Sequence, residues 1–342
     1  MIRVAMISFW HVHARDYARQ AREHPATEIV AAWDESPERG KTQASALGVP
    51  FYERLDELLT RPDIDAVIID TPTSMHRDVM VAAAQAGKHI FTEKVLAPTL
   101  RECNEILAAV DQAGVKLTVS LPRAYTGYTR AIQDILARGL LGEVTLIRTR
   151  LSHNGAVRTA ENPDGWLPAH FFDPHETLGG ALIDLGCHPM YLARLFAGPA
   201  LPESVSAHYG YITGRAVEDN AVAILHYPQG LLGVVEAGFV NRFSPFTIEI
   251  HGTEGSLFYG TPEEKLQLRS ALPAAGPGGQ WQTFSDFPPD LPSAFQQWVT
   301  HIQQETTATE NIRLAVELTM LMEAANLAAR GGQKVRLDEL AR

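Results

Sequence analysis

The chain has 342 residues, of which 45% are hydrophobic and 20% are charged, as in ordinary globular proteins. Its 40 acidic and 29 basic residues give a formal net charge of −11, which argues against nucleic acid or an anionic membrane as a partner, because phosphate binding needs a basic face. The two cysteines are too few for a disulfide framework, so we expect a reducing, cytoplasmic location. At about 100 to 200 residues per domain, the length favours two domains.

The first 122 residues alternate short apolar runs with helix-length segments, which is typical of a parallel sheet covered by helices. Ser36 followed by Pro37 predicts a helix start, and Gly48, Gly87 and Gly114 predict helix ends. The predicted strands are Ile2 to Ile7, Ile29 to Trp33, Ala66 to Ile69, His89 to Thr92 and Lys116 to Val119. We therefore expect residues 1–122 to form a Rossmann-type, doubly wound domain of the dinucleotide-binding kind.

Residues 123–342 change to longer alternating strands joined by tight turns, as in an open antiparallel sheet with one covered face. A helix is expected near Thr129 to Arg138, and a long one from Glu310 to Arg330, ended by two glycines. The predicted strands are Glu143 to His153, Val205 to Ile212, Asn220 to Tyr227, Leu231 to Val240, Thr247 to His251 and Ser256 to Tyr259. We expect an α+β domain with a large, open, mostly antiparallel sheet, whose C-terminal helix is a candidate to pack back on the first domain.

Open parallel sheets bind ligands beyond the carboxyl ends of their strands. The first predicted strand is followed by Ser8, Phe9, Trp10 and His11, where a dinucleotide-binding fold carries Gly-x-Gly-x-x-Gly. Ser8, Trp10 and His13 stand at the glycine positions, and a tryptophan restricts how closely the backbone approaches a pyrophosphate. The motif is therefore absent, although the strand-turn-helix context still offers a helix N-terminus to an anion.

Asp34 ends the second predicted strand. A carboxylate at this place can accept hydrogen bonds from an adenosine ribose and repel a 2′-phosphate, which favours NAD over NADP. The other interpretation is that Asp34 only caps the helix that starts at Ser36 and Pro37. The residue alone does not separate the two.

Two further groups of residues follow strands at the same edge. Thr71, Pro72 and His76 come after the third predicted strand, and Glu93 and Lys94 come after the fourth. All five are candidates for the ligand-binding edge. A lysine just past a buried strand is, taken alone, more often a solvated loop residue than a catalytic one.

The run from Gly179 to Pro189 holds an acid and a base four residues apart. On a helix, Asp184 and His188 would share one face and could present an acid–base pair to a single ligand. The alternative is an aspartate that orients a structural histidine. Pro189, directly after His188, should disturb the helical geometry.

Four motifs, in this order, resemble the glucose-fructose oxidoreductase / inositol dehydrogenase (Gfo/Idh/MocA) family, and the resemblance covers nearly the whole chain. They are Thr-Pro-x-x-x-His at 71–76, Ala-Gly-Lys-His-Ile-Phe-Thr-Glu-Lys at 86–94, Gly-Gly-Ala-Leu-Ile-Asp-Leu-Gly-Cys-His at 179–188 and Ile-Glu-Ile-His-Gly-Thr-Glu-Gly-Ser-Leu at 248–257. The resemblance implies a Rossmann domain, an α+β domain and a nicotinamide nucleotide, for which the ribose interpretation of Asp34 favours NAD over NADP. It also implies hydride transfer with a hydroxyl or carbonyl of a sugar, polyol or sugar derivative, and a homo-oligomer, a dimer or tetramer.

Carried over position by position, the resemblance makes Lys94 the catalytic lysine and places the family's Asp and His on Asp184 and His188; Val95 stands where the family has proline. Hydride leaves a carbinol carbon easily only as the hydroxyl proton leaves, so His188 is expected to act as the base and Lys94 to stabilise the alkoxide. Asp184 would orient His188 or bind an adjacent hydroxyl. The expected substrate-binding residues are Arg123, Tyr125, His153, Trp166, Asp184 and His188. The expected cofactor-binding residues are Ser8, Phe9, Trp10, His11, Asp34, Thr71, Pro72, His76, Glu93 and Lys94.

Two other functions stay open. A non-catalytic nucleotide- or sugar-binding auxiliary protein would explain the missing glycines, but it gives the trio of Lys94, Asp184 and His188 no purpose. A metal-dependent hydrolase is suggested by His11 and His13, because His-x-His after a first strand resembles the opening of the amidohydrolases. That reading needs an eight-unit barrel with further metal ligands, whereas the parallel pattern stops after about five units. We therefore expect no metal among the site residues.

Overall fold

The computed structural model describes residues 1–276 and 279–341, so residues 277, 278 and 342 of the predicted second domain lie outside the described residues. The described chain divides into two compact units. The first comprises Met1–Pro122 and Pro292–Thr319, and the second comprises Arg123–Leu291 and Met320–Ala341.

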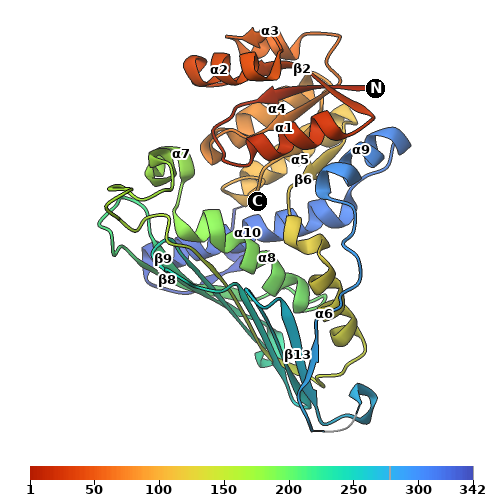
Figure 1. Ribbon diagram of the computed structural model, residues 1–342, viewed down its shortest axis with the longest axis vertical. Coiled ribbons are helices and arrows are strands. Elements are labelled where there is room, and N and C mark those ends of the chain that lie inside the picture. Colours follow the sequence, from red (N-terminus) through yellow and green to blue (C-terminus); the bar gives the residue numbers. More distant parts are fainter. Residues whose placement is uncertain (277–278, 342) are drawn as a thin grey trace. The chain divides into compact units, whose positions relative to one another are not determined.

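The first unit is built on a six-stranded parallel sheet in the order β3-β2-β1-β4-β5-β6 (Figure 1). Its strands are β1 (Ile2–Ile7), β2 (Thr27–Trp33), β3 (Phe51–Tyr52), β4 (Ala66–Ile69), β5 (His89–Thr92) and β6 (Leu117–Val119). The strand β4 is apolar and fully buried, as expected of a strand inside a covered sheet. The order reverses between β1 and β4, which is where doubly wound sheets bind ligands. The predicted Rossmann-type fold is confirmed.

Helices cover this sheet. They are α1 (Ala14–Glu23), α2 (Pro37–Leu47), α3 (Leu55–Leu59), α4 (His76–Gln85), α5 (Leu100–Ala113) and α9 (Ala294–Gln304). Three of them, α2, α4 and α5, end close to the glycines that predict helix ends. Helix α2 ends at Gly48, whose φ of 74° is the left-handed conformation that glycine adopts without steric cost. At the start of α5, the Thr99 side chain accepts a hydrogen bond from the Glu102 N–H (3.3 Å).

The C-terminal part of the chain contributes to this unit through α9 and the first half of α10 (Thr309–Gly331). Phe295 and Trp298 of α9 pack against Phe91 of β5, with ring centroids 5.5 and 5.7 Å apart. The Asn311 side chain bonds both the N–H and the carbonyl of Val119, each at 2.8 Å. Because β6 is an edge strand, these two bonds satisfy backbone groups that have no strand partner.

The second unit contains a nine-stranded sheet in the order β14-β13-β12-β11-β7-β10-β9-β8-β15. Its strands are β7 (Val144–Ser152), β8 (Ser204–Gly210), β9 (Asn220–His226), β10 (Leu232–Gly238), β11 (Thr247–Gly252), β12 (Gly255–Gly260), β13 (Lys265–Ser270), β14 (Gln282–Phe284) and β15 (Val335–Arg336). All pairs are antiparallel except β7 with β10. The predicted mostly antiparallel sheet is confirmed.

One face of the second sheet is covered by α8 (Cys187–Phe196), which packs on β7 and β10 (Figure 1). The remaining helices of this unit are α6 (Gly127–Ala137), α7 (Pro174–Thr177) and the second half of α10. Along β9, Ala221, Ala223 and Leu225 are buried, whereas Val222 is exposed, which is the alternation of a sheet with one covered face.

Both sheets are open, and the parallel one has six strands. This arrangement contradicts the eight-unit barrel that the hydrolase interpretation requires. Within residues 1–276 and 279–341, no helix combines the length and apolar character needed to cross a bilayer.

Candidate active site

The turn after β1 keeps the backbone conformation of a glycine turn without its glycines. Ser8 has a φ of 75°, in the left-handed region that non-glycine residues rarely adopt. Its side chain is buried, and its hydroxyl accepts a hydrogen bond from the Trp10 N–H (3.1 Å). Such a conformation persists only when the surrounding contacts hold it, so we infer that the residues around this turn stabilise it.

Asp34 is one of the groups that enforce the turn. Its buried carboxylate accepts hydrogen bonds from the backbone N–H groups of Phe9 (2.8 Å) and Ser36 (2.7 Å). The Arg39 guanidinium binds both oxygens, at 2.9 and 2.7 Å, and also contacts Glu35. The carboxylate therefore ties the turn after β1 to the start of α2, as the capping interpretation predicts. The Ser36 side chain makes no capping bond itself.

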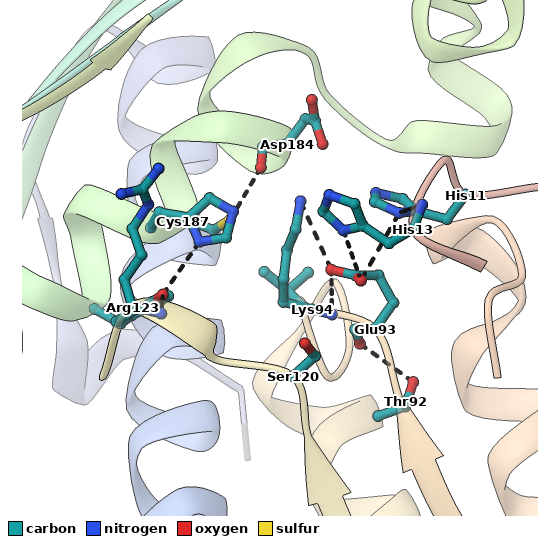
Figure 2. A network of polar contacts seen from close by, with 12 residues as sticks. His11, His13, Thr92, Glu93, Lys94, Ser120, Arg123, Asp184 and Cys187 are labelled. Carbon is teal, nitrogen blue, oxygen red and sulfur yellow. Dashed lines mark hydrogen bonds and ion pairs between the residues drawn. The ribbon is translucent and has the colours of Figure 1, made fainter. Parts of the chain in front are cut away.

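Glu93 is the centre of a buried polar cluster beyond β5 (Figure 2). Its Oε2 lies 3.1 Å from His13 Nδ1 and 3.8 Å from His11 Nδ1, while its Oε1 lies 3.9 Å from Lys94 Nζ. Burial opposes ionisation, but the charges of His11, His13 and Lys94 and the hydrogen bond from His13 hold the pKa of Glu93 well below its ordinary value. The expected site residues His11, Glu93 and Lys94 are thus brought together, with His13 added.

Two members of this cluster were missed by the sequence analysis. The Tyr17 hydroxyl contacts Glu93 Oε2 and Ser120 Oγ (2.8 Å), and burial followed by the charges of Glu93 and Asp70 raises the pKa of Tyr17. Asp70 is fully buried, and neither of its carboxylate oxygens has a hydrogen-bond partner in the described part of the chain. Burial and the Glu93 charge raise the pKa of Asp70 well above its ordinary value. The sequence signal that could have identified Asp70 as a site residue is its position directly after the strand β4.

His76 joins two loops of the same edge. Its ring nitrogens lie 2.8 Å from the Val95 carbonyl oxygen and 3.2 Å from the Thr71 carbonyl oxygen. Burial lowers the pKa of this histidine, as expected of a structural imidazole. Pro72 is buried beside Thr71, whose hydroxyl is buried without a hydrogen-bond partner among the described residues. The peptide bond between Lys94 and Val95 is cis.

In the second unit, Asp184 lies in a π-helix, Leu182–Gly186, that leads directly into α8, where His188 is the second residue. The expected single α-helical face is therefore not formed, because a π turn is wider than an α turn. Pro189, which has no N–H to donate, accounts for the irregular helix before it. Asp184 is half-buried and His188 is buried.

A short hydrogen-bonded chain supports His188. Its Nδ1 lies 3.1 Å from the Tyr191 hydroxyl, which accepts a hydrogen bond from the Arg123 N–H (2.9 Å). Burial raises the pKa of Tyr191 well above its ordinary value, so the phenol stays neutral. The Arg123 guanidinium lies over the Phe246 ring, 4.3 Å from its centroid, so part of its role is packing. Tyr191 was missed by the sequence analysis, although it is three residues from His188 on the same helix.

His153, at the end of β7, lies in a second group. Its ring stacks on Phe239 (centroids 5.1 Å apart) and lies 4.7 Å from the ring of Trp166, which is 51% exposed. Burial lowers the pKa of His153, against the smaller opposing effect of Asp184, so these two expected residues are neighbours. Tyr125 is half-buried, and its carbonyl accepts a hydrogen bond from the Leu291 N–H (2.8 Å).

The sheet order of the first unit, its glycine-type turn and the mixed sheet of the second unit define a two-part protein with a Rossmann nucleotide-binding fold. The chain belongs to the Gfo/Idh/MocA family. The family described as "Oxidoreductase family, NAD-binding Rossmann fold" matches residues 2–121, and the "GFO/IDH/MocA C-terminal domain" matches residues 129–258.

Two of the similar proteins are a reductase of an anhydro sugar and a dehydrogenase of a polyol. The 1,5-anhydro-D-fructose reductase of Ensifer adhaerens is 30% identical over 71% of this chain and 72% of its own length. The scyllo-inositol 2-dehydrogenase (NAD(+)) of Bacillus subtilis is 30% identical over 92% of this chain and 90% of its own. The crystal structure of an inositol dehydrogenase homologue from Azotobacter vinelandii, complexed with NAD+, shares the fold with a TM-score of 0.79, at 21% identity, over 98% of this chain and 97% of that chain.

Proposed function

We propose that this protein is an NAD(P)-dependent dehydrogenase that transfers hydride between the nicotinamide and a CH–OH group of a sugar, polyol or sugar derivative. The observation that carries the proposal is the left-handed turn at Ser8, in a chain that belongs to an NAD-binding oxidoreductase family. The nucleotide fits this edge in two respects: the backbone turn is retained, and the buried Thr71 hydroxyl has no hydrogen-bond partner among the described residues. Ser8 to His11, Thr71 and Pro72 would hold the nucleotide, which supplies the hydride acceptor or donor.

His188 is the proposed base. For its Nε2 to accept the hydroxyl proton, Nδ1 must carry the ring proton and donate it to the Tyr191 oxygen. That oxygen then accepts two hydrogen bonds, from His188 and from the Arg123 N–H, and its two lone pairs allow both. The Tyr191 oxygen is thus compatible with the tautomer in which Nε2 is a base.

Lys94 and Asp184 are proposed for the other two roles. The Lys94 ammonium would stabilise negative charge on the substrate oxygen as the proton leaves. Asp184, which is near His153, would accept a hydrogen bond from a neighbouring substrate hydroxyl. A carboxylate and an imidazole placed together are suited to a polyhydroxylated substrate, because both accept hydrogen bonds from hydroxyl groups.

The alternative function is a nucleotide- or sugar-binding protein without catalysis. The observation that favours it is the burial of Trp10 and His11 in the turn, where the family's glycines leave room for the nucleotide backbone. Deuterium transfer separates the two functions. We expect deuterium at the carbinol carbon of a sugar or polyol panel to appear in reduced nicotinamide, as measured by NMR. Saturable nucleotide binding without any transfer across the panel would favour the binding protein.

We also propose that NAD is preferred over NADP. Asp34 and Glu35 share the single guanidinium of Arg39, so this loop keeps a net negative charge that repels a 2′-phosphate. Because Asp34 also holds the turn, Glu35→Gln is the cleaner probe. This variant should lower the ratio of the NADP dissociation constant to the NAD dissociation constant by about fivefold. That factor is the effect of one charge roughly 4 Å away in water.

Calorimetric titration of both nucleotides would measure this ratio. Glu57→Gln, which removes an exposed carboxylate of α3, is the matched control and should leave the ratio unchanged. Tighter binding of NADP than NAD by the unmodified protein would refute the preference.

The open face of the second sheet is proposed to bind a second copy of this chain. Strands β9 and β10 place Ile224 opposite Val234 on this face, and Arg148 pairs there with Glu236, so the face carries apolar groups and both signs of charge. Such a surface can be self-complementary around a two-fold axis. We predict a dimer or tetramer by light scattering at micromolar concentration.

An Ile224→Asp variant should shift the protein toward the monomer, because it buries an unpaired carboxylate in the interface. Ile212→Asp, at a position that is 71% exposed, should keep the oligomer. If the unmodified protein is monomeric, or if both variants keep the oligomer, this sheet face is not the interface.

A further inference from the structure

Three side chains with metal-binding atoms converge beyond the ends of β1 and β5 (Figure 2). His11, His13 and Glu93 each offer one ligand atom, and these atoms all lie within 4.8 Å of one another. The histidines come from the turn after β1 and the glutamate comes from the residue after β5. The proposed proton and hydride transfers use neither imidazole, although His11 belongs to the run that would hold the nucleotide.

The distances match those between neighbouring ligands of a tetrahedral ion. Zinc binds nitrogen and oxygen at about 2.0–2.2 Å, which places two tetrahedral ligands roughly 3.3–3.6 Å apart. In the structure, Glu93 Oε2 lies 3.1 Å from His13 Nδ1 and 3.8 Å from His11 Nδ1. Shifts of a few tenths of an ångström would therefore bring Glu93 Oε2 to coordination geometry with each imidazole, and the two imidazole ligand atoms lie within 4.8 Å of each other.

The neighbours of these three side chains orient the ligand atoms in a way that suits a bound ion. His11 Nδ1 accepts a hydrogen bond from the His13 backbone N–H at 3.2 Å, so this nitrogen is unprotonated, as a metal ligand must be, and a bound ion would replace that hydrogen bond. Tyr17 contacts Glu93 Oε2 and is held by Ser120, which is the kind of outer partner that orients a carboxylate ligand. The Lys94 ammonium faces the other carboxylate oxygen, Oε1, so it leaves Oε2 to the imidazoles.

A second observation points to a cation. Asp70 follows β4, the strand between β1 and β5, and its carbonyl accepts a hydrogen bond from the His11 N–H (3.2 Å). Its carboxyl group is fully buried, without a hydrogen-bond partner among the described residues. A buried carboxyl group without partners is costly, and a nearby divalent cation would offset that cost.

We propose that His11, His13 and Glu93 bind one divalent transition-metal ion of zinc-like preference. Two imidazoles and a carboxylate are a ligand set that suits zinc and its neighbours. Three protein ligands leave a fourth position for water or for an oxygen of a bound molecule. The ion is a property of the chain beyond the proposed dehydrogenase function, and its binding is measurable without any substrate.

Cobalt(II) is the probe, because its visible absorption reports tetrahedral coordination. The full chain, stripped with a chelator, is titrated with Co²⁺, and Zn²⁺ is then added as competitor. We expect one Co²⁺ per chain, a tetrahedral spectrum and displacement by Zn²⁺. His13→Gln, at a side chain that is 39% exposed, should weaken the affinity by at least about 10- to 100-fold, the loss seen when only a supporting partner is removed.

His208→Gln, an exposed histidine of the second unit, is the control and should bind as the unmodified chain does. Circular dichroism of each variant checks that it folds. Absence of stoichiometric Co²⁺ binding by the unmodified chain overturns the proposal, as does unchanged affinity in His13→Gln. Titrating NAD onto the same samples separates this outcome from failure of the dehydrogenase function, because nucleotide binding can persist where metal binding is absent.

Discussion

His188→Asn should lower turnover by about 10² to 10⁴-fold, the usual cost of losing a positioned general base. The acidic limb of the pH profile should disappear with it, because an imidazole ordinarily titrates near neutral pH and asparagine does not titrate at all. Nucleotide affinity should be nearly unchanged, since His188 belongs to α8 and the proposed nucleotide contacts belong to the edge of the parallel sheet. Steady-state rates from acidic to basic pH, with calorimetry of NAD binding, measure both effects.

Two variants make this prediction specific. Tyr191→Phe removes the hydroxyl that faces His188 Nδ1, so it should lower kcat less than His188→Asn and should move the acidic limb without removing it. His208→Asn, an exposed histidine of the same unit, should behave as the unmodified enzyme. Full turnover and an unchanged pH profile in His188→Asn would refute its role as the base.

Lys94→Ala should reduce kcat by about 10² to 10³-fold, as observed when a donor to a developing oxyanion is removed. The change takes away the ammonium that we propose stabilises the substrate oxygen, so the loss should fall on kcat more than on KM. Lys41→Ala, which removes an exposed ion pair with Glu53 and a cation–π contact with Phe51, is the control. Rates and deuterium transfer with the best substrate of the panel measure the effect.

The double variant tests whether the two groups act on one step. If His188 and Lys94 serve the same proton transfer, the reductions in kcat caused by the two substitutions should not multiply. The double variant should then be little slower than the slower of the two single variants. Fully additive losses would place Lys94 in a different step. A Lys94→Ala enzyme with unchanged kcat would contradict the assignment altogether.

The sequence predicted those parts of the fold that carry strong periodic signals. β1, β4 and β5 begin and end at the predicted residues, because each is a buried apolar run bounded by turn or cap residues. The two-residue strands β3 (Phe51–Tyr52) and β15 (Val335–Arg336) were missed, since two residues are too few to show a period. The parallel pairing of β7 with β10 was also missed, because alternation along a strand does not reveal its partner.

The candidate site was predicted less completely, because its contacts join residues that are far apart in the sequence. Asp34 had two interpretations, and its bonds to Phe9 N and to Arg39 depend on the folding of the turn after β1. The π-helix at Asp184 has no periodic signature of its own, although Pro189 signalled an irregularity. Asp70 was not selected, because its burial without a partner is visible only in the folded chain.

The most direct measurement is calorimetric titration of NAD and NADP onto the purified, full-length chain. The proposed oxidoreductase depends on a nucleotide at an edge where Ser8, Trp10 and His13 replace the three glycines. We predict saturable binding of one nucleotide per chain, with NAD tighter than NADP. Absence of binding by both nucleotides would contradict the central claim that this turn still holds a nicotinamide nucleotide.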